Sequence, residues 1–367
     1  MVDPTTGEYD DMPHIAPGNI EPFTGRILDN VKTVKEEQLI SGKFRFRPND
    51  VVYGKINPQL GKYFYASIDG LTSADAYVFN GKNGITQKFL YSVLQTKDFF
   101  KYSISVSKRS GMPKINRDEL NAYSFCVPKE EEQEKIGDFL LGIDNLITLH
   151  QRKCDETKKL KKFMLQKMFP KKDANKPEIR FAGFTDDWEQ RKLGDTVQIT
   201  MGQSPDGSTY SETPSDYILV QGNADLKDGW VSPRVWTSQM TKKADAGDLI
   251  MSVRAPAGAM GKTAYNAVIG RGVAAIKGNE FIYQSLVKMD SNGYWKKLSS
   301  GSTFESLNSN NIKDAEIFVP CDEEQQKIGQ YFSNLDNLIT LHRRAYYNKK
   351  GGLTNVHNDN QQHYAIL

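Results

Sequence analysis

The chain has 367 residues, of which 38% are hydrophobic and 25% charged, and its mean hydropathy is −0.57. This composition suffices for two domains with cores of their own, and no apolar run is long enough to suggest a membrane span. The formal net charge of +3 permits nucleic-acid binding without requiring it. The first residues form neither a basic start nor an apolar stretch, so we expect a cytoplasmic protein.

The first part of the chain, residues 1–128, is predicted to form a β-rich domain with some helix. Strand-like runs separated by Gly, Pro and Asn lie at residues 43–46, 50–53, 62–67 and 76–79. The segment QKFLYSVLQTKDFFK, residues 87–101, places its apolar side chains near one face of a helix. A last strand is expected at residues 120–127.

A long amphipathic helix follows, predicted to end near residue 169. Its apolar row includes Ile136, Ile143 and Ile147, continues with His150, and returns at Leu160 and Met164. At about 1.5 Å per residue the rod is about 60 Å long, so we expect it to pair with another helix through a partly polar seam. An ordinary core helix is the alternative.

The second half is predicted to repeat this plan. Strands are expected at residues 196–200, 217–221, 248–253 and 273–276, and a helix near residues 281–289. A second amphipathic helix carries the apolar row Ile328, Leu335, Ile339 and His342. Gly351 and Gly352 are expected to break it. The predicted divisions are residues 1–128 (first domain), 129–169 (central helix), 170–187 (linker), 188–320 (second domain), 321–345 (second helix) and 346–367 (polar tail).

An internal repeat supports this division. Residues 127–153 and 319–345 align without a gap, 192 residues apart, and 16 of 27 positions are identical. A spacing of that size is typical of duplicated domains, and the loops between the matching segments differ. The first half has no counterpart of the WEQRKLG segment that begins at Trp188, so we expect its domain to be short at the N-terminal side. The second helix is expected to be too short to cover residues 160–168, which would then pair with a second copy or another protein.

Signals for catalysis are weak. GAMGKT at residues 258–263 resembles a phosphate loop, but Pro256 stands where its first glycine belongs. No set of nucleophile, base and acid emerges, and the three cysteines are unclustered, which argues against a disulfide scaffold or a zinc site. His150 and His342 occupy equivalent helix positions and are interpreted as polar residues that specify helix pairing.

Basic and amide side chains near predicted strand ends are candidates for DNA contacts, because such groups read base edges and bind phosphates. In the first half the candidates are Lys43, Arg45, Arg47, Lys55, Lys108 and Arg109. In the second half they are Gln203, Arg234, Lys242, Arg254, Arg271 and Lys296. Lys43, Arg45 and Arg47 are predicted to share one strand face. Ordinary solvated surface charge is the alternative for about half of the set. Arg254 is favoured because its strand gives way there to a Pro-Gly loop.

Taken in order, these segments resemble the DNA specificity subunit of type I restriction-modification enzymes. The resemblance rests on VP-x-x-EEQ-x-KIG with DNLITLHQRK, KKLKKFMLQKMFP and RF-x-GF-x-DDWEQRKLG, and it covers roughly residues 20–345. It implies an α+β fold in which two similar target recognition domains are separated by long helices that pair as an antiparallel coiled coil.

The resemblance also implies a function. Each domain would read one part of a bipartite site in double-stranded DNA, while the helices fix the gap and dock two methyltransferase subunits. Those subunits use S-adenosylmethionine, and restriction (translocase) subunits use ATP and Mg; this chain would carry no cofactor and no catalysis. The alternatives are a truncated or silent cassette that acts as a half-site DNA binder or a helical scaffold, and a stand-alone enzyme.

Overall fold

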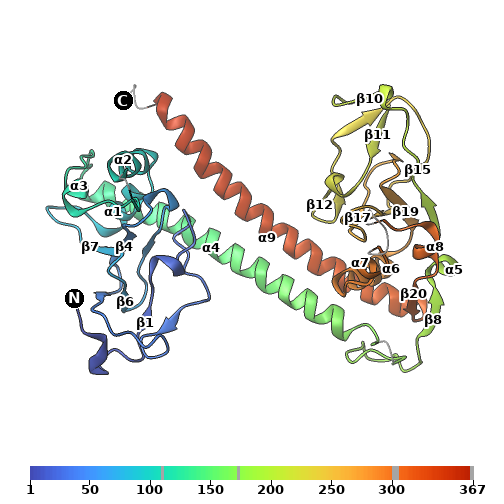
Figure 1. Ribbon diagram of the computed structural model, residues 1–367, viewed down its shortest axis with the longest axis horizontal. Coiled ribbons are helices and arrows are strands. Elements are labelled where there is room, and N and C mark those ends of the chain that lie inside the picture. Colours follow the sequence, from blue (N-terminus) through green and yellow to red (C-terminus); the bar gives the residue numbers. More distant parts are fainter. Residues whose placement is uncertain (109–110, 172–173, 300–305, 364–367) are drawn as a thin grey trace. The chain divides into compact units, whose positions relative to one another are not determined.

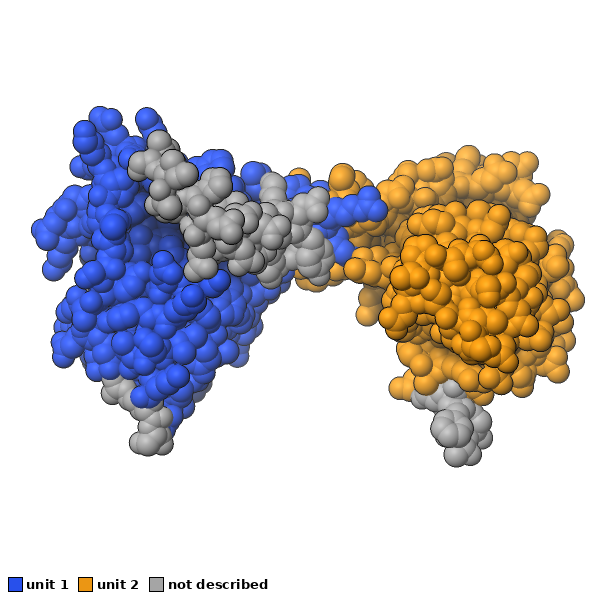
Figure 2. Space-filling view, turned by 90° about the horizontal axis from the view of Figure 1, so that it is seen from above, with its two compact units in different colours: residues 1–152, 342–367 blue, residues 153–341 orange. Residues whose placement is uncertain are grey.

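The computed structural model describes residues 1–108, 111–171, 174–299 and 306–363. The chain divides into two compact units (Figure 2), which we call unit 1, residues 1–152 and 342–367, and unit 2, residues 153–341. Each unit contains a β-rich body with short helices and a stretch of two long helices, α4 and α9 (Figure 1). Among the described helices, none is long and apolar enough to cross a membrane.

Unit 1 is built on two small sheets. In the first, of order β2-β1-β6-β3, β1 pairs parallel with β6 and the other neighbours are antiparallel; the second, β5-β4-β7, is antiparallel throughout. The strands are β1 (Pro13–His14), β2 (Lys32–Thr33), β3 (Phe44–Phe46), β4 (Val51–Gly54), β5 (Tyr63–Tyr65), β6 (Gly70–Thr72) and β7 (Ala76–Phe79). The helices are η1 (Pro4–Thr6), η2 (Pro17–Asn19), η3 (Pro58–Leu60), α1 (Gln87–Leu94), α2 (Lys97–Ser107) and α3 (Arg117–Asn121).

The core of unit 1 is rich in aromatic side chains. Tyr53 of β4 lies edge-on to Phe99 of α2, with ring centroids 5.5 Å apart, and Tyr63 of β5 lies edge-on to Tyr91 of α1 at 5.9 Å. Such pairs hold the helices on the three-stranded sheet. The predicted single helix over residues 87–101 is two helices, because Thr96 interrupts it and its Oγ1 accepts from the N–H of Phe99 as the N-cap of α2.

Unit 2 has the same plan with longer sheets, of order β10-β14-β11-β18-β15 and β12-β13-β17-β16-β19-β9, and a separate pair, β8 with β20. The strands are β8 (Glu189–Lys192), β9 (Gln198–Met201), β10 (Tyr210–Ser211), β11 (Tyr217–Val220), β12 (Leu226–Lys227), β13 (Trp230–Val231), β14 (Val235–Thr237), β15 (Lys243–Ala244), β16 (Leu249–Ser252), β17 (Met260–Lys262), β18 (Ala267–Ile269), β19 (Val273–Lys277) and β20 (Glu316–Val319). The helices are α5 (Leu193–Thr196), η4 (Gly207–Thr209), η5 (Asn223–Asp225), α6 (Glu280–Ser291), α7 (Tyr294–Ser299) and α8 (Ser309–Lys313).

The core of unit 2 includes the end of α4 and the start of α9. Phe169 stacks on Phe281 of α6 at a centroid distance of 5.4 Å, and Trp188 and Phe332 lie at 6.0 Å from Phe169. All four side chains are buried. Arg180 of the linker forms two hydrogen bonds of 2.7 Å with Glu324, a fully buried carboxylate in the first turn of α9. The long helices are therefore structural parts of unit 2.

The two units repeat one framework, as the sequence repeat predicts. Asn116 and Asn308, 192 residues apart, each form a capping box at the start of α3 and α8. The N–H of Ile115 donates to Lys55 O (3.0 Å) in unit 1, and the N–H of Leu307 donates to Val253 O (2.8 Å) in unit 2. These matching contacts show which residue of unit 1 corresponds to which residue of unit 2.

Helices α4 (Glu130–Lys167) and α9 (Asp322–His363) run antiparallel. In unit 2, Cys154 Sγ lies 3.8 Å from Ile339 O, and further along α4 Lys161 Nζ lies 2.6 Å from Asp336 Oδ1. In unit 1, His150 and His342 face each other with their Nδ1 atoms 3.1 Å apart. Because the partner number on α9 falls as the α4 number rises, the pairing is antiparallel.

Two expectations about the strands and long helices are wrong, and a third is wrong in part. Residues 120–127 form no strand; β20, the counterpart of residues 124–127, is a strand because β8 pairs with it, and the described part of unit 1 holds no counterpart of β8. Gly351 and Gly352 do not end α9, since glycine costs a helix only about 1 kcal/mol and does not forbid it. The stretch 160–168 is partnered only in part: Leu165 and Met168 are buried in the core of unit 2, because antiparallel pairing brings the start of α9 to them, whereas Leu160 and Phe163 are exposed.

Candidate nucleic-acid interface

Loops that follow β9, β11, β16 and β18 come together at one end of the sheets of unit 2. The N–H of Gln203 donates to Ile269 O (2.8 Å), which joins the β9 loop to the end of β18. The N–H of Val253 donates to Gly272 O (2.9 Å), which joins the β16 and β18 loops. The N–H of Gly270 donates to the last carbonyl of β11 (2.8 Å). These contacts link segments that are far apart in the sequence.

Four of the predicted DNA contacts lie on or beside these loops with exposed side chains. We call Gln203, Lys242, Arg254 and Arg271 the loop patch. The carbonyl of Lys242 accepts from the N–H of Ile269 (2.8 Å), which sets Lys242 beside the Gln203 loop. Within this patch, an amide and three cations occupy adjoining loops, the combination that contacts base edges and phosphates.

The Arg254 loop is firmly held although the Arg254 side chain is exposed. Ser252 Oγ donates to Arg254 O (3.0 Å). Gly258, at φ +100°, closes the loop against the fully buried Trp295, and a Cβ added there would lie 2.5 Å from the Trp295 Cβ. A positive φ and so close a contact require glycine. The backbone of this loop is therefore preorganised.

Arg234 and Lys296, the other two candidates of unit 2, have different surroundings. Arg234 donates through Nε and Nη2 to Oδ1 of the buried Asp225 (3.0 and 2.8 Å), and Asp225 Oδ2 accepts from the N–H of Gln221 (2.7 Å). Arg234 therefore braces the β11 loop. Lys296 is exposed on α7, the residue after Trp295, whose indole packs on the Arg254 loop.

The prediction missed polar groups that border the loop patch. Thr241 Oγ1 donates to Gln203 O (2.6 Å), and Gln221 and Asn223 flank Gly222 directly after β11. The available signal was Gln-Gly-Asn at the end of a hydrophobic strand, which is typical of a loop that presents amides. The Thr241 contact depends on a distant residue and had no local signal.

In unit 1 the predicted basic strand face is wrong. Lys43 is buried, and its Nζ donates to Ser41 O (2.9 Å) and Ser41 Oγ (2.6 Å), because the backbone of Val2 pairs with Lys43 and covers it. Arg45 is held by Asp69, with Nε 3.0 Å from Oδ1 and Nη2 2.5 Å from Oδ2. This pair raises the pKa of Arg45 and lowers that of Asp69.

The other candidates of unit 1 are spread over its surface. Arg47 and Lys108 are exposed, after β3 and after α2 respectively. Lys55 is half-buried, with Nζ 5.3 Å from the centre of the Tyr77 ring. Arg109 lies outside the described residues. The candidates of unit 1 that the structure describes do not form a counterpart of the loop patch.

The residues predicted for helix pairing lie on the inner and flanking faces of α4 and α9. Buried are Ile147, Ile328, Leu335 and Ile339; partly buried are Ile136, Ile143, His150, Met164 and His342; Leu160 is exposed.

An equivalent glutamine holds the first turn of each long helix, α4 in unit 1 and α9 in unit 2. Gln133 Oε1 accepts from Thr86 N (3.0 Å) while its Nε2 donates to the carbonyls of Gly84 and Pro128 (both 2.9 Å). In unit 2, Gln325 Nε2 donates to Pro320 O (3.0 Å) and its Oε1 accepts from Asn279 Nδ2 (2.9 Å).

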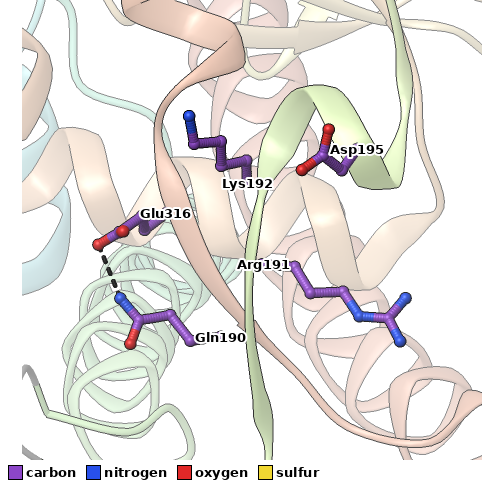
Figure 3. A pocket seen from close by; sticks show the side chains of 5 residues that line it. All are labelled: Gln190, Arg191, Lys192, Asp195 and Glu316. Carbon is purple, nitrogen blue, oxygen red and sulfur yellow. Dashed lines mark hydrogen bonds between the residues drawn. The ribbon is translucent and has the colours of Figure 1, made fainter.

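A hollow on the surface of unit 2 offers no catalytic arrangement. It is an open polar depression over β8 and β20 (Figure 3), lined by Gln190, Arg191, Lys192, Asp195 and Glu316, in which Gln190 Nε2 donates to Glu316 Oε2 (2.7 Å). Its lining carries no serine, threonine, cysteine or histidine. Elsewhere in the described part of the chain, no group of three or more His, Cys, Asp or Glu side chains could hold a metal ion.

Comparison with known proteins gives one consistent family. The model of the type I restriction modification DNA specificity domain matches residues 7–159 and 185–348, one match in each half. The putative type I restriction enzyme MjaX specificity subunit of Methanocaldococcus jannaschii is 29% identical over 344 residues, 86% of this chain and 78% of that protein. The type I restriction enzyme EcoDI specificity subunit of Escherichia coli is 33% identical over 129 residues, 35% of this chain and 28% of that protein.

Solved structures share the fold. The S subunit of a type I restriction-modification system from M. genitalium superposes with a TM-score of 0.71 at 14% identity, covering 97% of this chain and 90% of that one. A chain from a study of complex assembly and conformational transition of a type I system has a TM-score of 0.50 at 24% identity, with 97% and 91% covered. The α+β fold with two similar domains and long helices is thereby confirmed.

Proposed function

This chain belongs to the type I restriction-modification DNA specificity subunit family, and we propose that it reads a bipartite DNA site, one part through each unit. The observation that carries the proposal is the loop patch. Two frameworks whose shared strands are paired in the same order carry different loops, and in unit 2 those loops gather Gln203, Lys242, Arg254 and Arg271, all exposed, on adjoining segments. Different loops on equal scaffolds are suited to reading different sequences.

Within the patch the side chains have distinct roles. Arg254 and Gln203 stand on anchored backbone, so they are positioned to form bidentate contacts with base edges. Arg271 and Lys242 flank them and supply charge for phosphates; the N–H of Arg271 and its Nε both contact Ser204 Oγ (3.1 and 3.4 Å). Arg234, held by Asp225, keeps the neighbouring loop in shape.

The long helices serve as the spacer between the reading units and as the docking surface for two methyltransferase subunits. Exposed apolar side chains along both helices support a protein partner there. They are Phe139, Leu146, Leu149, Leu160, Phe163, Leu338 and Leu341. The methyltransferase subunits use S-adenosylmethionine, restriction subunits that join use ATP and Mg, and this chain contributes recognition without a cofactor of its own.

The proposal is tested by the salt dependence of DNA binding. The chain, copurified with its methyltransferase subunit, is titrated onto a random-sequence duplex pool between 50 and 200 mM salt. Removing one phosphate contact with Arg271→Ala lowers the slope of log K against log salt by about 0.9. Lys243→Ala, at an exposed cation that is paired with Asp245, is the matched control and leaves the slope unchanged.

Selection of tight binders from the same pool separates base reading from phosphate binding. Arg254→Ala weakens binding to the selected sequence by about 1–3 kcal/mol, and one position of the consensus becomes less specific. Equal slopes and equal consensus sequences for all variants and the parent would assign DNA reading to another surface.

A further inference from the structure

Unit 1 has its own loop in the place that the Arg254 loop holds in unit 2. The loop spans residues 55–62, between β4 and β5, and we call it the Asn57 loop. Across its base the N–H of Gly54 donates to Lys62 O (2.7 Å), as the N–H of Ser252 donates to Ala259 O (2.8 Å) in unit 2. The two loops therefore leave equivalent strands and return to equivalent strands.

The two loops present different side chains. Ile56 forms an isolated β-bridge with the segment before α3, as Arg254 does with the segment before α8, so Ile56 stands at the position of Arg254. The polar side chains of the Asn57 loop come directly after this position: Asn57 is partly exposed and Gln59 is exposed. Unit 1 thus offers amides where unit 2 offers a guanidinium.

The two amides are oriented by each other. Gln59 Nε2 donates to Asn57 Oδ1 (3.3 Å). This contact uses a donor of Gln59 and an acceptor of Asn57, so Gln59 Oε1 can still accept and Asn57 Nδ2 can still donate to a ligand. In the major groove adenine shows the complementary pair, its N6 amino group as donor and its N7 as acceptor. Guanine shows two acceptors, O6 and N7, which suit an arginine instead.

The backbone that carries the amides is held from both sides. The N–H of Asn57 donates to Pro113 O (2.8 Å). Within the loop the N–H of Leu60 donates to Asn57 O and the N–H of Gly61 to Pro58 O, both at 2.9 Å. Asn57 itself is left-handed, with φ 51°, a conformation that asparagine adopts more readily than most residues. The Asn57 loop is therefore preorganised, like the Arg254 loop.

Lysines stand on the segments that adjoin the amides. Lys114, which is exposed, forms the bridge with Ile56, and its N–H donates to Ser107 O (3.4 Å), the residue before the exposed Lys108. An exposed carboxylate, Asp75, lies on the neighbouring loop. Lysines beside base-reading groups bind phosphates and set the position of the protein on the duplex.

We propose that Asn57 and Gln59 are the residues through which unit 1 reads an adenine in its part of the DNA site, whereas Arg254 of unit 2 reads a guanine in the other part. The proposal rests on the proposed function, in which each unit reads one part. Gln59 Oε1 accepts from the N6 amino group of the adenine, and Asn57 Nδ2 donates to its N7. Lys108 and Lys114 bind phosphates beside that base.

The test selects tight-binding duplexes from the random-sequence pool, using the full chain copurified with its methyltransferase subunit. Gln59→Ala and Asn57→Gly should each make one adenine less specific, in the part of the consensus that Arg254→Ala leaves unchanged, and weaken binding at least about 5-fold. Glycine adopts φ 51° without strain, so Asn57→Gly removes the amide and keeps the backbone. Asn121→Ala, at an exposed amide of α3, is the matched control and leaves the consensus unchanged.

A base analogue tests the contact atom by atom. 7-Deazaadenine at the assigned position lacks N7 and still pairs with thymine. It should weaken binding by the parent at least about 5-fold, but should leave binding by Asn57→Gly unchanged, because that variant has already lost the donor to N7. 7-Deazaguanine at the position assigned to Arg254 is the control and should weaken binding by both proteins equally.

The outcomes separate this proposal from the proposed function. A bipartite consensus that Gln59→Ala and Asn57→Gly alter no more than Asn121→Ala does would overturn the adenine contact and leave the proposed function intact. Equal weakening of the parent and Asn57→Gly by 7-deazaadenine would do the same. A parent that selects no bipartite consensus would overturn the proposed function, and the adenine contact with it.

Discussion

Asp144 of α4 offers a pH-dependent test of how the long helix is attached to unit 1. Burial raises its pKa from 3.8 to about 6, and a hydrogen bond from Gln95 Nε2 (3.2 Å) opposes the rise only in part. A carboxyl whose pKa is higher in the folded state binds its proton more tightly there. The loss of folding stability caused by the Asp144 charge is therefore absent below pH 3.8. It grows as the carboxyl of the unfolded chain ionises, and it is complete above pH 6.

The size of the effect follows from the two pKa values. The difference between 3.8 and about 6 corresponds to about 3 kcal/mol of lost stability at pH 7.5, and to about half of that at pH 5. Asp144→Asn removes the charge and keeps an oxygen for Gln95. We expect the variant to be more stable than the parent by up to about 3 kcal/mol at pH 7.5, with a gain that shrinks as the pH falls.

Urea unfolding measures the change in the free energy of unfolding separately for the two units. All four tryptophans lie in unit 2, so tryptophan fluorescence reports unit 2 and far-ultraviolet circular dichroism reports both. The expected shift appears in circular dichroism only. Asp138→Asn, which removes an exposed carboxylate paired with Lys88, is the control and gives no gain. If Asp144→Asn is no more stable than the parent at pH 7.5, or if its gain does not change with pH, burial of the Asp144 carboxylate does not destabilise unit 1.

Three further changes test the framework. Arg180→Ala leaves the buried Glu324 carboxylate unpaired and should destabilise unit 2 by about 3–5 kcal/mol in the same fluorescence assay. The double variant Arg180→Met with Glu324→Leu should lose far less stability. Equal losses for the two variants would contradict the pairing. Gly258→Ala forces a side chain against Trp295 at φ +100° and should lower the stability of unit 2 by at least about 1–3 kcal/mol. It should also loosen the Arg254 loop, which hydrogen exchange would detect as faster exchange of the loop amides. Unchanged exchange would show that the loop adapts. Gln133→Ala removes three hydrogen bonds at the start of α4 and should cost about 1–3 kcal/mol in unit 1, measured by circular dichroism; no loss would mean that water replaces them.

The sequence predicted the features that depend on local pattern or on the repeat. The apolar rows through Ile147 and Ile339 predicted both long helices, and the matching histidines predicted that the helices meet, since His150 and His342 contact each other directly. Arg254 was placed correctly on an exposed loop after a buried strand, because a strand followed by Pro and Gly is a local signal.

Features that depend on distant contacts were not predictable. Lys43 alternates with Phe44 and Phe46 as an exposed residue would, but the backbone of Val2 covers it. Residues 122–127 look like a strand, yet strand formation requires a partner, and the pattern of one segment does not show whether its partner is present. The loop patch likewise exists only because hydrogen bonds join loops nearly 70 residues apart, such as Ser204 with Arg271.

The proposed function requires that each unit reads one part of a bipartite site. The most direct measurement is to coexpress the chain with its methyltransferase subunit and map methylated adenines across the host genome. We expect one bipartite motif with a fixed gap, in which Arg254→Ala relaxes positions of one part only. A palindromic motif that repeats a single half-site, or no methylation despite an assembled complex, would contradict it.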